Sequence, residues 1–152
     1  MSRGISLIET LVVVAILALI AALGTASLSA YQTNLTLTKS AEELVRRLEE
    51  AKTQAITGAG GTAHGVKFNG DSYITFNGDS FNASDPNNKT YALPEKVGVS
   101  NTIAGEDDAL LFARITGNIG QTATVTVFWR GDPSKKKDIA VGPFGFIEAG
   151  AE

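Results

Sequence analysis

An uninterrupted apolar run from Leu11 to Leu23 constrains the fold of this chain more than any other feature. Together with Ile5, Leu7 and Ile8 it forms a segment of about 19 apolar residues, close to the roughly 20 that span a bilayer core. The segment contains a single carboxylate, Glu9. A charge within a membrane helix costs about 2.5–3.5 kcal/mol on insertion scales, so we expect Glu9 to have a function and a cationic partner.

The residues alone leave three interpretations of this segment open. It is a cleaved secretory signal peptide, a plain single-pass anchor, or a helix in which Glu9 has a specific task. Ser27-Leu28-Ser29 has the small residues that a signal peptidase would cut after, but the charged leader is short. Arg3 is the only upstream charge and Lys39 the first basic residue downstream, which favours a cytoplasmic N-terminus.

The residues Gly4-Ile5-Ser6-Leu7-Ile8-Glu9, followed by the apolar run, resemble the N-terminal signature of type IV pilins and type II secretion pseudopilins. In that family a prepilin peptidase cuts after the glycine and methylates the new N-terminus. The resemblance implies cleavage between Gly4 and Ile5, which makes Glu9 the fifth residue of the mature chain. Ile5 stands where Phe or Met is usual, and Ser6 where Thr is usual.

The resemblance also implies a function. The chain would be a non-enzymatic structural subunit, a minor pilin or pseudopilin, held in a bacterial inner membrane as a single-pass protein with its C-terminal domain outside the cytoplasm. Its partners would be the lipid bilayer, the prepilin peptidase, an inner-membrane assembly platform and, in the filament, other subunits. The free amine at Ile5 of a neighbouring subunit would then be the partner of Glu9.

A helical pattern continues beyond the apolar run and ends at Gly58. An apolar stripe at helical spacing comprises Ala41, Leu44, Val45, Leu48, Ala55 and Ile56. Ser40 could begin a capping box and restart the helix, although the stripe keeps its phase and favours continuity. The predicted organisation is a leader (1–4), a transmembrane or filament-core helix half (5–28), an amphipathic half (29–57) and an antiparallel β domain (58–152).

After Gly61 the hydrophobic period changes to two, which is typical of strands. Residues 64–68 and 72–76 flank Asn69-Gly70, a strong hairpin turn signal. Residues 122–129 alternate like a half-buried strand, whereas 131–137 are polar and predict a loop. One long helix followed only by short strands predicts an α+β fold with the helix packed across an antiparallel sheet.

The composition includes few residues of the kinds that catalyse reactions or bind metals. There is no cysteine and one histidine, His64, so we expect no catalytic residues, no metal site and no cofactor. The formal net charge of −3 gives no global basic field. The one basic cluster, Lys135, Lys136 and Lys137, is either a polar hairpin tip or a contact for DNA phosphates or a partner surface.

Three further segments resemble the minor pilin and H-type pseudopilin group: 44–56, 111–117 and 139–147. Some minor pilins of this group bind DNA in natural transformation. The alternative function is therefore a DNA-binding minor pilin that uses the three lysines.

Overall fold

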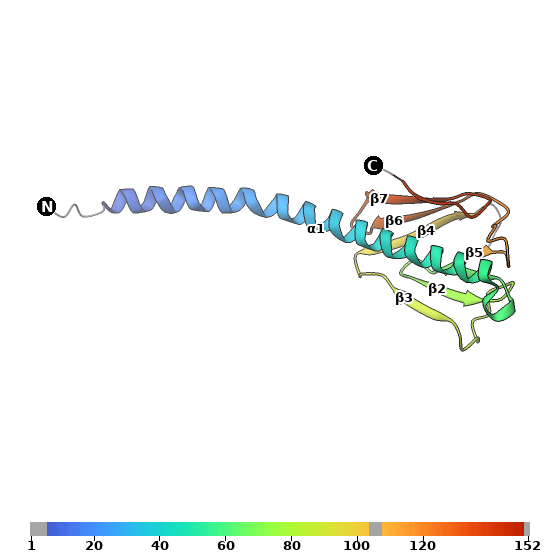
Figure 1. Ribbon diagram of the computed structural model, residues 1–152. Coiled ribbons are helices and arrows are strands. Elements are labelled where there is room, and N and C mark those ends of the chain that lie inside the picture. The colour runs from blue at the N-terminus through green and yellow to red at the C-terminus, as the bar shows by residue number, and fades with distance from the viewer. Residues whose placement is uncertain (1–5, 104–107, 151–152) are drawn as a thin grey trace. The chain divides into compact units, whose positions relative to one another are not determined.

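The computed structural model describes residues 6–103 and 108–150, and the side chains of residues 22–27 lie outside the described set. The described residues form one long helix, a short 3-10 turn and eight strands (Figure 1). In chain order these are α1 (Leu7–Thr57), η1 (Ala59–Gly61), β1 (His64–Phe68), β2 (Ser72–Asn77), β3 (Lys89–Ala92), β4 (Val97–Ile103), β5 (Ala109–Phe112), β6 (Ala123–Trp129), β7 (Asp132–Val141) and β8 (Ile147–Ala149). The chain divides into two compact units, Met1–Leu35 and Thr36–Glu152, and each is described by itself.

The long helix is a single element. Its 51 residues contain no proline and are rich in alanine and leucine, which have high helix propensity. Ser40 lies in mid-helix, so the helix does not restart there. Gly58 follows the last residue with a φ of 68°, and this left-handed conformation, which glycine adopts without strain, ends the helix as predicted.

The strands form two antiparallel four-stranded sheets rather than one. The first sheet has the order β3-β2-β1-β5 and contains the predicted hairpin, in which Phe68 pairs with Tyr73 across the Asn69-Gly70 turn. Gly70 has a φ of 79°, which explains the glycine at this position. The second sheet has the order β4-β6-β7-β8.

One predicted loop is wrong. Residues 132–137 belong to β7, which pairs with β6 at Asp132 and from Lys136 to Val141, with a bulge over residues 133–135 beside Trp129. Lysine has low strand propensity, but the pairing of Lys136 and Lys137 with the alternating β6 overrides this local preference, and Pro133 lies in the bulge.

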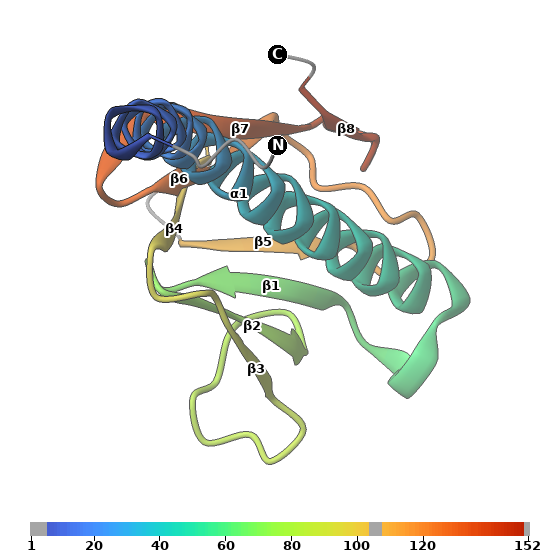
Figure 2. The ribbon, with the colours of Figure 1, turned by 90° about the vertical axis from the view of Figure 1, so that its left-hand side faces the viewer.

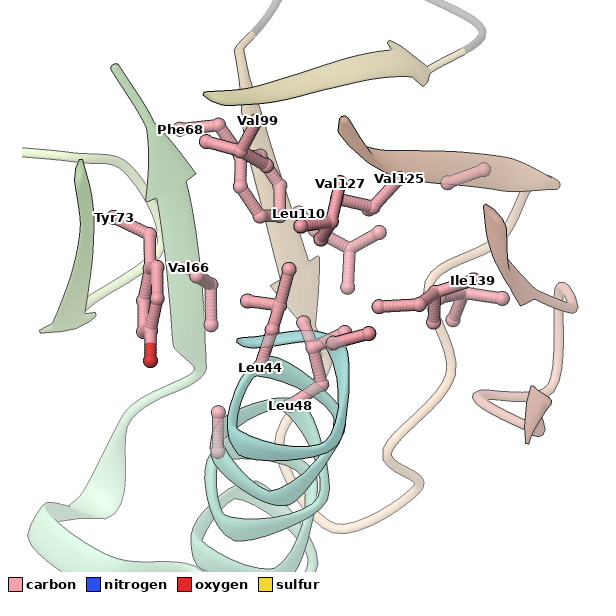
Figure 3. Packing of buried hydrophobic residues seen from close by; sticks show 14 of the residues in the cluster. Leu44, Leu48, Val66, Phe68, Tyr73, Val99, Leu110, Val125, Val127 and Ile139 are labelled. Atoms are coloured by element: carbon pink, nitrogen blue, oxygen red, sulfur yellow. The ribbon is translucent and has the colours of Figure 1, made fainter. Parts of the chain in front are cut away.

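The core lies between the two sheets and the C-terminal part of α1, which covers both of them (Figure 2). The buried helix positions recur at intervals of three and four: Leu37, Ala41, Leu44, Leu48, Ala51 and Ala55. Leu44 and Leu48 project between Val66 of β1 and Ile139 of β7 (Figure 3). Removing such side chains from water stabilises the fold by about 1.5–3 kcal/mol each. The predicted α+β fold, a long helix packed on antiparallel β structure, is confirmed.

Arg130, directly after β6, connects the two sheets. Its Nε donates a hydrogen bond to the Val97 carbonyl of the second sheet over 3.0 Å, and its Nη2 donates to the Gly70 carbonyl in the turn of the first sheet over 3.2 Å. The Val99 amide also donates to Gly70 O over 3.0 Å. The hairpin turn of one sheet is thus fixed to the first strand of the other.

Candidate assembly surfaces

Glu9 lies in the first turn of α1, and its side chain is exposed. A carboxylate at this position interacts favourably with the helix dipole, by about 0.3–1 kcal/mol at an exposed site. The Thr10 amide donates to the Ser6 carbonyl over 3.1 Å and begins the helical ladder. The predicted processing point, Gly4 and Ile5, lies outside the described residues.

The described apolar side chains of the N-terminal unit are exposed. Leu7 is 84% exposed, Leu11 62% and Leu19 66%, with no core of their own. A shallow groove along one side of the helix is lined by Leu7, Thr10, Leu11, Val14, Ala15 and Ala18. Among the described residues, no helix combines the length and the hydropathy that a membrane span requires.

The three lysines lie on β7, where successive side chains point to opposite faces of the sheet. Ile139 and Val141 of this strand are buried, so Lys137 shares their face and Lys136 occupies the other, while Lys135 lies in the bulge where the register with β6 shifts. Lys136 Nζ lies 3.1 Å from Asp138 Oδ2, and Lys135 Nζ lies 4.0 Å from Asp132 Oδ2. The chain therefore divides the basic cluster between two faces and pairs part of its charge.

Asp138 on β7 is held by a hydrogen bond from the neighbouring strand. The Thr126 hydroxyl donates to its Oδ1 over 2.6 Å, across the β6–β7 pair. This hydrogen bond, together with Lys136, holds the pKa of Asp138 below its usual value. Asp138 therefore remains an anion at neutral pH and neutralises Lys136.

His64 begins β1 and is 3% exposed, so it is a buried histidine rather than a surface one. Its Nε2 lies 2.8 Å from the Ala59 carbonyl oxygen, and its Nδ1 has no hydrogen-bond partner among the described residues. It lines a cavity of about 410 Å³ with Arg47, Gln54 and Asn77, among others, and the described lining residues include no serine or cysteine. The contact of His64 with Ala59 thus joins the turn after the helix to the first strand.

Charged side chains on α1 pair with each other beside this cavity. Arg47 contacts Glu43 and Glu50, each over 2.9 Å, and its guanidinium lies 4.1 Å from the ring centroid of Tyr91. Arg46 also contacts Glu43, over 2.7 Å, and this hydrogen bond holds the pKa of Glu43 below its usual value. Among the described residues, no group of three His, Asp or Glu side chains could hold a metal ion.

One surface has no counterpart in the sequence predictions. Ile56 was expected on the buried stripe, but it is 44% exposed. Ile115 is 66% exposed, and so is Phe146, while Phe144 is 77% exposed. The sequence signal for this surface was Gly142-Pro143-Phe144-Gly145-Phe146, in which a proline and two glycines interrupt strand pairing around two large apolar side chains.

Comparisons with known proteins find likeness in structure alone. No family model matches the chain, and no curated protein matches it. The minor pseudopilin EpsH from the type 2 secretion system of Vibrio cholerae matches with a TM-score of 0.58 and 17% identity, covering 76% of this chain and 96% of that one. The chain has the fold of a minor pilin or minor pseudopilin.

A second minor pilin fold supports this conclusion. The type IV minor pilin FimU of Pseudomonas aeruginosa matches with a TM-score of 0.61 and 15% identity, covering 76% of this chain and 88% of that one. The minor pilin fold is thus shared with one protein of a secretion system and one of a pilus. This fold agrees with the one that the resemblance of the N-terminal residues implies.

Proposed function

We propose that the protein is a non-enzymatic structural subunit, a minor pilin or pseudopilin, of a type IV pilus or type II secretion pseudopilus. The observation that carries the proposal is the continuity of α1. The second half of this helix packs on a domain with the minor pilin fold. The first half is apolar and exposed, and in the sequence it carries the prepilin-like signature. A long apolar surface of this kind requires cover by lipid or by other helices.

The proposed sequence of events follows from this helix. The precursor waits in the bacterial inner membrane with its C-terminal domain outside the cytoplasm, and a prepilin peptidase cuts after Gly4 and methylates Ile5. An assembly platform then transfers the helix from lipid to the filament. Lipid and neighbouring helices are similarly apolar, so hydrophobicity contributes little to this transfer. A pairing between Glu9 and the amine at Ile5 of a neighbour would supply the register between subunits.

The test is the substitution Glu9→Ala. We expect it to leave membrane insertion intact, because it removes a charge from an apolar segment, and to reduce incorporation into filaments sheared from the cells. The matched control is Glu42→Ala, which removes an exposed carboxylate from the same helix. Normal incorporation of the Glu9 variant would exclude the proposed pairing.

The competing proposal is DNA binding by Lys135, Lys136 and Lys137. It has less support, because these lysines lie on two faces of the sheet and Lys136 is paired with Asp138. If it holds, the detergent-solubilised chain retards duplex DNA at low salt, and replacing the three lysines with glutamate abolishes retardation. Absence of retardation by the unmodified chain would end this proposal.

A further inference from the structure

The described part of the C-terminal unit exposes four large apolar side chains, and all four belong to three adjoining segments. They are Ile56, Ile115, Phe144 and Phe146, here called the phenylalanine surface. Ile56 lies at the end of α1, Ile115 between β5 and β6, and the two phenylalanines between β7 and β8. Exposed apolar side chains that gather in this way mark interaction sites.

Backbone contacts hold the three segments together. A Cβ at Gly117 would lie 2.8 Å from Ile56 Cγ1, so the glycine allows the β5–β6 loop to lie directly on the helix end. Gly145, between the two phenylalanines, packs against the Gly117 carbonyl oxygen. The Ile119 amide donates to the Pro143 carbonyl over 3.0 Å, which joins the two loops. The surface is therefore built on fixed backbone.

Ile115 is held in an unfavourable conformation. Its φ of 72° is the only positive value among the described non-glycine residues, and a β-branched side chain strongly disfavours this region. Its amide donates to the Ala55 carbonyl over 2.9 Å, at the end of α1. Strained residues of this kind persist where the surroundings fix them, and they cluster at functional sites.

Two cations lie within the surface. The stem of Lys52 lies over both loops, since its Cγ is 3.2 Å from a Cβ position at Gly117 and its Cε 3.4 Å from one at Gly145. Arg114 precedes Ile115, and its Nε is 3.9 Å from a Cβ position at Gly58. Among the described residues neither cation has an ion pair or hydrogen bond. The surface thus offers apolar side chains and two unpaired positive charges.

We propose that the phenylalanine surface docks a different subunit of the filament, one that presents apolar side chains bordered by carboxylates. This inference rests on the proposed function. A second copy bound face to face would bring Lys52 and Arg114 against the same cations of its partner. The described residues of the C-terminal unit expose no other large apolar side chain that could fit it. The apolar helix half of another copy lacks any carboxylate between Glu9 and Glu42.

The experiment places a photo-crosslinking phenylalanine derivative at position 144 of the full chain, in the cells that produce it. The matched control places it at Thr124, an exposed position in β6. We expect position 144, and not 124, to give an adduct with a different protein that carries a prepilin-type N-terminus. An adduct with a second copy of this chain, or the same adducts at both positions, would overturn the proposal, and so would no adduct from chains inside the filament.

A separate variant tests whether docking requires the positive charges of Lys52 and Arg114. Lys52→Glu combined with Arg114→Glu should lower the yield of the adduct at position 144 at least about fivefold, because the carboxylates of the partner would then be repelled. Lys89→Glu, which changes an exposed lysine outside the surface, should leave the yield unchanged. An unchanged yield in the double variant, at unchanged thermal stability, would overturn the proposed partner chemistry.

The same samples separate this proposal from the function on which it rests. If the chain enters sheared filaments but position 144 gives no adduct with another subunit, the docking proposal fails and the filament function stands. If the unmodified chain never enters the filament fraction, the proposed function fails.

Discussion

Gly65 lies in β1 where the strand is enclosed on both sides. A Cβ at this position would lie 2.7 Å from Cε1 of Phe76 and 2.9 Å from the carbonyl oxygen of Leu110. Phe76 is 2% exposed, so its ring has little room to move. We expect Gly65→Ala to reduce the free energy of unfolding by about 1–3 kcal/mol, as overpacking does, measured by chemical unfolding in detergent.

The matched control is Gly131→Ala. A Cβ there would meet only Trp129 at 3.4 Å, an ordinary contact distance. Its effect should therefore stay within about 0.5 kcal/mol, as for most surface substitutions. Equal stability of the two variants would show that the ring of Phe76 moves aside.

The phenol of Tyr73 should lose its proton only at unusually high pH. It is 2% exposed and stacks on Tyr91 at 5.3 Å, and burial raises its pKa from 10.0 to about 12. The unfolded chain therefore loses this proton at lower pH than the folded one. The stabilisation is complete below pH 10 and is lost as the pH rises from 10 to about 12.

Phenolate absorbance measures this directly. One tyrosine of the folded chain should ionise near pH 12, and Tyr73→Phe should remove that step. If the same step remains in the Tyr73→Phe variant, the late titration belongs to Tyr31 or Tyr91.

The backbone conformation of a single residue was predictable where one local rule determines it. Asn69-Gly70 predicted a turn because only certain residues adopt its dihedral angles. Ile115 was not predictable, because its left-handed conformation contradicts the preference of a β-branched side chain and is imposed by contacts with the helix end. The spacing between Gly4 and Glu9 can be recognised only in the sequence. The roles of these residues in processing and assembly stay predictions.

At the scale of elements, the helix was predictable because its apolar period is maintained over many turns. The separation into two sheets was not, because it depends on which strands pair across long stretches of chain. Nor was β7, where Lys136 and Lys137 pair with β6 and Pro133 is accommodated in a bulge. The lysines were therefore expected at a loop tip, but Lys136 and Lys137 lie in the paired part of a strand and Lys135 in its bulge.

The buried stripe of α1 should be the most sensitive part of the helix. Leu48 has no exposed surface, and it packs between the sheets. We expect Leu48→Ala to cost about 2–5 kcal/mol of stability, through lost burial and the cavity that remains. Unfolding followed by the fluorescence of Trp129, the only tryptophan, measures this loss.

The control is the neighbouring Glu49→Ala, which alters an exposed position and should change stability by less than about 0.5 kcal/mol. A similar small loss in Leu48→Ala would mean that the helix contributes little to the core.

For the whole molecule, the mature N-terminus distinguishes the remaining functional classes. The proposed function predicts a chain that begins with methylated Ile5, which N-terminal sequencing and intact mass would detect. A secreted enzyme behind a signal peptide predicts a start near Ala30, and a plain anchor retains Met1. Either of these results would contradict the prepilin assignment, whatever the fold of the domain.

The bonds of Arg130 and Gly70 to β4 have a consequence for how the folded protein avoids aggregation. The edge strands β3, β5 and β8 are only three or four residues long, too short to template the addition of a foreign strand. The longer edge strand, β4, has its Val97 carbonyl and Val99 amide occupied by these bonds. Under the proposed function, copies crowded at a membrane would therefore offer few free strand edges to one another, which leaves the helix and specific surfaces to decide when a filament grows.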